Sequence, residues 1–95
     1  MKLKNIQCPL VYILILNWNG KEDTIKCIES LKKIDYPNYQ IIIIDNNSTD
    51  NSINIFKEKY PNIMILENKK NLGYAEGNNV GIRHALKNKA DYVLY

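Results

Sequence analysis

The sequence predicts an α/β fold, a Rossmann-like, doubly wound and mostly parallel sheet with flanking helices. Three observations predict it. Short apolar runs rich in β-branched residues alternate with segments of helical periodicity. The runs are apolar at successive positions, which is typical of strands covered on both faces. Polar residues follow each of the first three runs, as expected where parallel strands end at one edge of a sheet.

The first strand and helix are separated by a short polar break. Residues 10–16 are continuously apolar and predict a buried strand. Residues 17–20 interrupt it, and residues 21–33 then place isoleucine and leucine side chains about one helical turn apart, which predicts an amphipathic helix. Pro37 cannot continue a helix, so a turn is expected around it.

The second strand is predicted over residues 40–45, where four isoleucines in succession demand burial on both faces. The abrupt change to polar residues at 45–50 marks the carboxyl end of this strand. Further along, the periodicity predicts the remaining elements: a helix at 51–59, a strand at 63–67, a loop at 68–74, a helix at 75–88 and a strand at 91–95. Right-handed crossovers between these strands give the doubly wound arrangement, in one unit of residues 1–95.

Composition bounds the class of protein. With 45% hydrophobic and 24% charged residues, the 95-residue chain is expected to be globular and to have a core. The net charge of +3 comes from scattered lysines with a single arginine, so no nucleic-acid partner is expected. Cys8 and Cys27 lack metal or redox spacing, and no apolar run reaches the roughly 20 residues of a membrane helix. A cytoplasmic location is therefore expected.

Three polar loops are predicted to meet beyond the carboxyl ends of the strands, at 17–20, 45–50 and 68–73. Neither a glycine-rich dinucleotide turn nor a Gly-Lys-Ser/Thr phosphate loop is present. Asp45 stands at the end of the isoleucine strand, with one side of its environment expected to be open. Its carboxylate is suited to accept the N3–H of a uracil or thymine ring. Equally, it is suited to cap its own turn through the Asn47 or Ser48 amides.

Several segments together resemble family 2 glycosyltransferases of the GT-A fold. They are LNWNG at 16–20, CIESL at 27–31, Tyr-Pro at 36–37, IDNNSTDNS at 44–52 and NLGYAEGNNVG at 71–81. The likeness extends over about residues 9–95 and is closest to the rhamnosyltransferase-like branch.

The resemblance implies a nucleotide-sugar site. It places Asn17, Trp18 and Asn19 against the base and Asp45 on its N3–H, with Asn47 in a supporting role in the same loop. Asp50 is expected to fix this loop onto the following helix as an N-cap. The resemblance also places three further residues, Asn71, Gly73 and Asn78, along the ribose and diphosphate. For Asn79 and Gly81 the alternative is that they allow the helix to pack closely on the sheet.

The implied activity is transfer of a sugar from a UDP- or dTDP-sugar to a saccharide or lipid-linked acceptor, with inversion. In the family, the strand that begins here at residue 91 leads into paired carboxylates that hold Mg²⁺ or Mn²⁺ on the diphosphate. Those ligands are not in this chain, and neither are catalytic residues, so these residues alone are expected to bind nucleotide without turnover. A full-length protein peripheral to the membrane and self-association through an open sheet edge are also expected.

Two other classes fit the same outline. A sugar nucleotidyltransferase would need a glycine-rich, basic loop after the first strand, where Asn17-Trp18-Asn19-Gly20-Lys21 stands instead. A non-catalytic α/β regulatory module of the receiver type would need two acidic residues after that strand. Both remain alternatives to the glycosyltransferase interpretation.

Overall fold

The seven predicted elements are present in the predicted order in the computed structural model, which describes residues 8–95. The strands are β1 (Val11–Asn17), β2 (Tyr39–Asp45), β3 (Met64–Glu67) and β4 (Tyr92–Leu94), and the helices are α1 (Lys21–Leu31), α2 (Ser52–Lys59) and α3 (Gly73–Lys87). Their ends differ from the predicted ends by at most two residues. The first seven residues of the predicted 1–95 unit lie outside the described residues.

The strands form one sheet in the order β3-β2-β1-β4, and all neighbours are parallel. The chain first moves outward from β1 through β2 to β3, and then crosses back to place β4 on the other side of β1. This reversal of direction next to β1 is the topological switch point of a doubly wound sheet. The predicted fold class is therefore confirmed.

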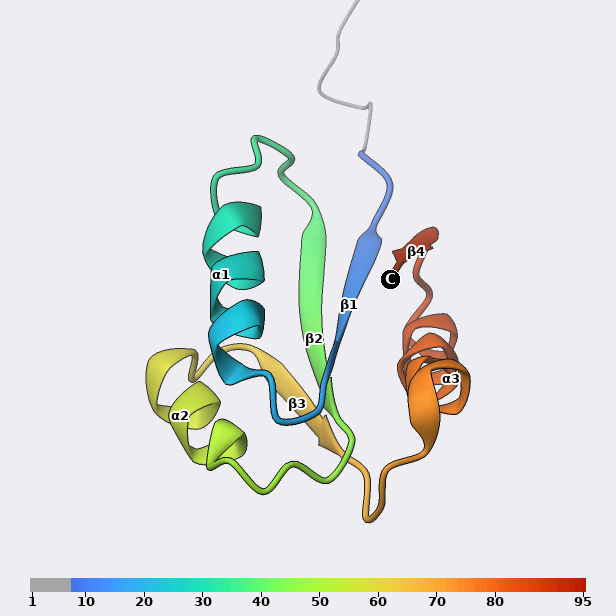
Figure 1. Ribbon diagram of the computed structural model, residues 1–95. Helices are drawn as coiled ribbons and strands as arrows, with labels where there is room; N and C mark the ends of the chain where they lie inside the picture. The colour runs from blue at the N-terminus through green and yellow to red at the C-terminus, as the bar shows by residue number, and fades with distance from the viewer. Residues whose placement is uncertain (1–7) are drawn as a thin grey trace, which may run out of the picture.

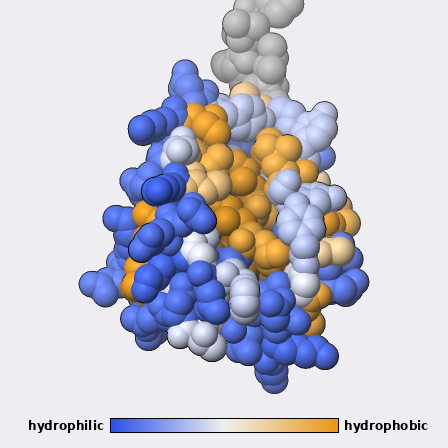
Figure 2. All heavy atoms as spheres, viewed as in Figure 1, coloured by the Kyte–Doolittle hydropathy of each residue, from blue (hydrophilic) through white to orange (hydrophobic). Residues whose placement is uncertain are grey.

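Helices cover both faces of the sheet, with α1 and α2 on one side and α3 on the other (Figure 1). The side chains of β1 and β2 alternate between two apolar clusters because successive strand residues point to opposite faces. Ile13, Ile15, Ile41 and Ile43 pack with Ile28, Phe56 and Tyr60 of the first helical layer. Leu14, Ile42 and Ile44 form the second cluster, under α3. Figure 2 shows apolar residues in the middle of this view, flanked by hydrophilic ones.

Two glycines let α3 approach the sheet closely. A Cβ atom on Gly81 would lie 2.4 Å from Ile44 Cδ1, and one on Gly77 would lie 2.7 Å from Leu16 Cδ1. No larger residue fits at either position without displacement of the sheet side chains. The close-packing interpretation of Gly81 is thus confirmed. Within residues 8–95, no helix has the length and apolarity needed to cross a bilayer.

Candidate functional site

The polar loops after β1, β2 and β3 meet at one edge of the sheet, as predicted. Asn17, the last residue of β1, pairs in register with Asp45, the last residue of β2, and Asp45 pairs with Glu67 at the end of β3. The three strands therefore end at the same level, and α1 and α3 begin next to that level (Figure 1). This edge is where ligands of open α/β sheets bind.

Asp45 is fully buried, with 0% of its surface exposed. Asn17 Nδ2 and Ser48 Oγ donate hydrogen bonds to Asp45 Oδ1 at 2.9 and 2.7 Å, and the Ser48 amide donates to Oδ2 at 2.8 Å. The expectation that one side of this carboxylate is open is therefore wrong. The alternative, a carboxylate that caps its own turn, is the arrangement present, because the strand end lies under the loop that follows it. A base would reach Asp45 only by displacing one of these donors.

Asn17 joins the first loop to the second loop and to α1. Its side chain is buried, and besides Asp45 it contacts Thr24, whose hydroxyl donates to Asn17 Oδ1 at 2.7 Å. Asn19 continues the connection, since its amide donates to Ser48 Oγ at 2.9 Å and its Oδ1 accepts from the Thr49 amide at 2.7 Å. Both asparagines thus support the loops through their side chains.

Trp18 differs from Asn17 because 55% of its surface is exposed, and Asn19 is exposed as well although its side chain bonds to the second loop. Asn47 is exposed as well, and its positive φ of 66° lies in the left-handed region that asparagine tolerates. Trp18 and Asn47 leave the buried network and face outward from the first and second loops. Together with the exposed Asn19, they are the predicted site residues of these loops that can meet a ligand.

Asn46 is a residue of the site that sequence reasoning did not assign. It is 2% exposed, its Nδ2 donates to the Gly73 carbonyl at 3.0 Å, and its Oδ1 accepts from Asn68 Nδ2 at 2.9 Å. Asn46 thus joins the second loop to the third loop and to the start of α3. Strand alternation was the signal that could have found it, since it points opposite to Asp45, toward the α3 face.

The remaining predicted residues lie at the start of α3. Asn71 Oδ1 accepts from the Gly73 amide at 2.8 Å, and Gly73 has a φ of 81°, which favours glycine. Both are exposed, whereas Asn78, in the second turn of α3, is buried. The structure therefore brings Asn71 and Gly73 to the surface of the edge and places Asn78 behind them.

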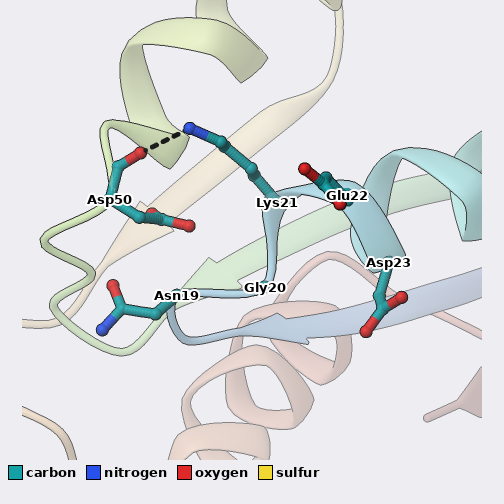
Figure 3. Close-up of a pocket in the computed structure, with 6 residues that line it drawn as sticks. All are labelled: Asn19, Gly20, Lys21, Glu22, Asp23 and Asp50. Atoms are coloured by element: carbon teal, nitrogen blue, oxygen red, sulfur yellow. Dashed lines mark hydrogen bonds between the residues drawn. The ribbon is translucent and has the colours of Figure 1, made fainter.

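A polar hollow of about 340 Å³ lies between the first loop, the start of α1 and the end of the second loop. Lys21 Nζ crosses it and donates to the Asp50 carbonyl at 2.9 Å (Figure 3). Besides these two residues, Asn19, Gly20, Glu22 and Asp23 line it. This volume is at the small end of ligand pockets, so it suits one polar part of a ligand.

Asp50 fixes the second loop onto α2, but the N-cap residue of this helix is Asn51 and not Asp50 as expected. The Ser52 amide donates to Asp50 Oδ1 at 3.1 Å, and the Ser52 hydroxyl donates to the same oxygen. Desolvation acts to raise the pKa of Asp50, but the bonds from Ser52 and the charge of Lys21 outweigh it and hold this pKa below its usual value. The carboxylate is therefore ionised at neutral pH beside the hollow.

No group of three or more histidine, cysteine, aspartate or glutamate side chains within residues 8–95 is placed to hold a metal ion. The residues of the described edge that accept hydrogen bonds are mostly asparagines already bonded to their neighbours. They do not fit a divalent-cation site.

Comparison with known proteins gives a consistent result. The sequence model described as Glycosyl transferase family 2 matches residues 12–95. An uncharacterised glycosyltransferase of Haemophilus influenzae is 32% identical over 78 residues, which are 79% of this chain and 24% of that protein. A poly(ribitol-phosphate) beta-glucosyltransferase of Bacillus spizizenii is 32% identical over 91 residues, covering 90% of this chain and 14% of that protein.

Among solved structures, the fold is similar to that of a mannosyltransferase from Pyrobaculum calidifontis in complex with GDP-Man and Mn²⁺. The TM-score is 0.71 at 22% sequence identity, over 84% of this chain and 25% of that one. The chain thus spans about a quarter or less of the length of these proteins. None of the three is described as a rhamnosyltransferase.

Proposed function

Because the chain belongs to glycosyl transferase family 2, we propose that it binds the nucleotide of a nucleotide-sugar donor at the carboxyl edge of its sheet. The observation that carries this proposal is the family match over residues 12–95. The geometry supports it. Two buried side chains, Asp45 on one face and Asn46 on the other, hold three loops in fixed positions at this edge. Fixed loops reduce the entropy cost of binding.

In this proposal the buried and exposed residues have different roles. Asp45, Asn46 and Asn17 position the loops and do not contact the donor. Their side-chain polar atoms are already used in hydrogen bonds to residues of the neighbouring loops and of α1. The exposed residues Trp18 and Asn47 contact the base and ribose. Asn71 and Gly73, at the start of α3, lie along the diphosphate, where the helix N-terminus favours negative charge.

The base is proposed to be a pyrimidine, so the donor is a UDP- or dTDP-sugar, as in the branch that the sequence resembles. The exposed ring of Trp18 offers a stacking surface for a base. The mannosyltransferase with the similar fold holds GDP-Man, so a guanine nucleotide is the competitor that an experiment has to include.

Trp18 provides the test, since it is the single tryptophan of the chain. Its fluorescence is followed during separate titrations with UDP, dTDP, GDP and ADP, and calorimetry of the same pairs gives the affinities. We expect quenching by UDP and dTDP at concentrations at which GDP and ADP leave the signal unchanged. Equal responses to all four nucleotides, or none to any, would refute the proposed base preference.

A matched pair of variants distinguishes the loss of a contact in the proposed site from the general effect of an asparagine-to-glycine substitution. Asn47→Gly removes an exposed side chain from the proposed site, and Asn51→Gly removes one from a residue of nearly the same backbone conformation, with φ of 66° and 67°. Glycine adopts both without strain. Loss of one hydrogen bond, about 1 kcal/mol, predicts roughly fivefold weaker UDP binding for Asn47→Gly. Asn51→Gly should bind as the unaltered chain does.

The reaction of the whole protein is proposed to be transfer of the sugar to a saccharide or lipid-linked acceptor, with inversion. In the full-length protein, Mg²⁺ or Mn²⁺ would neutralise the leaving diphosphate. No described residue is assigned as a metal ligand or as a catalytic base. Incubation of the 95-residue chain with donor, Mn²⁺ and acceptors should therefore yield no product, and measurable turnover would contradict this assignment.

The chain is also proposed to self-associate through β4. This strand lies at an edge of the sheet, and its Tyr92 and Leu94 side chains are exposed. An unpaired edge accepts a further strand. Light scattering at increasing concentration should show a rising mass, whereas a constant monomer mass would contradict it.

A further inference from the structure

Within residues 8–95, the α3 face of the sheet is only partly covered. Two helices, α1 and α2, cover the opposite face, whereas α3 alone packs on this one, over β1 and β2. Of the β3 side chains that point the same way, Met64 is 47% exposed, whereas Leu66 is half-buried and packs against the cluster of Leu14, Ile42 and Ile44. Met64 and Leu66 share this face with Ile42 and Ile44 because they are paired in register with them.

Two adjoining hollows follow this uncovered strip beside α3, and His84 lines both. One, of about 190 Å³, reaches Met64 near the amino end of β3, and the other, of about 360 Å³, lies between Leu66 and Val80. We name the two together the α3–β3 groove, defined by Met64, Leu66, Val80, Arg83, His84 and Lys87. Met64, Leu66 and Val80 form an apolar strip along its floor, and Gln40, Asn62 and Asn88 border the strip at the Met64 end.

The helical wall of the groove is basic. Arg83 and Lys87 lie four residues apart, on one side of α3, and both are exposed. No aspartate or glutamate is among the residues that line either hollow. Glu67, the nearest acidic residue along β3, is paired with Lys57 at 3.4 Å. Within residues 8–95 neither Arg83 nor Lys87 is in an ion pair, and an apolar strip below such a basic wall is complementary to an apolar surface that carries negative charge.

We propose that the α3–β3 groove binds an acidic amphipathic helix of a partner protein. A helix packs about 8–10 Å from its neighbour, so one helix beside α3 would lie over β3 and complete the layer. Its leucine-type side chains would cover Met64 and Leu66. Two glutamates four residues apart would face Arg83 and Lys87, which have the same spacing along α3. A lipid surface fits less well, because the floor is recessed beside the helix instead of protruding from it.

The experiment uses a synthetic acidic peptide of about 18 residues that carries leucines on one helical face and glutamates beside them. A permuted peptide of the same composition, without an apolar face, is the control ligand. Binding is measured by calorimetry and by NMR shifts of the ¹⁵N-labelled chain. We expect the amphipathic peptide to bind and to shift the amides of Leu66, Val80 and His84, and the permuted peptide not to bind.

Charge reversal tests the basic wall. R83E/K87E should weaken peptide binding by about tenfold or more, because two attractions become repulsions. K26E/K33E makes the same change of charge at two exposed lysines in and just after α1, and should alter binding by less than about twofold. Met64→Asp places a negative charge in the floor, which repels the acidic peptide and should also weaken binding. No buried side chain is lost, because Met64 is exposed.

Three results would overturn the proposal. They are equal binding of the two peptides, equal weakening by the two charge-reversal pairs, and shifts confined to residues outside the groove. Phosphatidylserine vesicles are tested in parallel. The unaltered chain could co-sediment with these vesicles and fail to bind the peptide. If R83E/K87E then abolished the co-sedimentation, the groove would be assigned to a membrane surface instead.

Discussion

Replacement of Asp45 by asparagine tests whether this carboxylate supports the loops or recognises the base. The substitution keeps the shape of the side chain and removes its charge. Asp45 accepts hydrogen bonds from Asn17 Nδ2, from the Ser48 hydroxyl and from the Ser48 amide, at 2.7–2.9 Å. An asparagine has one carbonyl oxygen, so its own NH₂ group must face at least one of these donors.

The expected cost follows from that geometry. If the NH₂ group replaces Oδ2, it faces the Ser48 amide, and if it replaces Oδ1, it faces Asn17 Nδ2. Either orientation leaves a buried donor without an acceptor, which costs about 1–3 kcal/mol. We therefore expect Asp45→Asn to lower the free energy of unfolding by about 2 kcal/mol, or the melting temperature by roughly 8–16 °C.

Urea denaturation followed by circular dichroism measures this loss, and Asp35→Asn, the same change at an exposed position, is the control. The control should unfold as the unaltered chain does. The relative affinities for UDP, dTDP, GDP and ADP should be the same in Asp45→Asn as in the unaltered chain. Unchanged stability together with a lost preference among the nucleotides would refute the supporting role and assign Asp45 to the base.

Three further outcomes are expected. Gly81→Ala should destabilise the chain by about 1–3 kcal/mol in urea, because its Cβ would meet Ile44 Cδ1 at 2.4 Å, and an unchanged midpoint would argue against close packing of α3. Asn46→Ala should cost about 1–2 kcal/mol and speed amide hydrogen exchange in residues 68–72, whereas unchanged exchange there would contradict its linking role. Desolvation and the bond to Glu29 raise the pKa of Tyr60 to about 12. Because the folded pKa lies above the unfolded value of about 10, the stabilisation is complete below pH 10 and is lost between pH 10 and 12. Denaturation across this range should show the loss, and Tyr60→Phe should remove it.

The fold was predictable because each element has a local cause in the sequence. Successive isoleucines in β2 require two covered faces, which only a sheet between helical layers provides. Pro37 and Pro61 lie where helices have ended, and the polar residues after each strand locate the edge at which the loops meet. Parallel pairing follows from the helical crossovers between successive strands, whereas the return of β4 to the other side of β1 was not predicted.

The site was predictable in its place and not in the roles of its residues. The sequence predicts that Asp45 ends β2 and allows it to cap its own turn through Ser48, but it contains no signal that Asn17 also donates to that carboxylate. The role of Asn46 depends on Gly77, whose missing side chain lets α3 come within reach of it. The contact of Asn17 with Asp45 and the approach of Gly77 to Asn46 are not local, since each joins segments far apart in the chain.

The sequence by itself determined the layers, the order of the elements and the sheet edge that holds the site, because hydrophobic periodicity and strand ends are properties of neighbouring residues. Only the tertiary structure decided which polar side chains are buried supports and which are exposed. It also decided that β3 carries an uncovered strip beside the basic side of α3. Burial and hydrogen-bond partners depend on how closely distant segments approach, and no local pattern contains those distances.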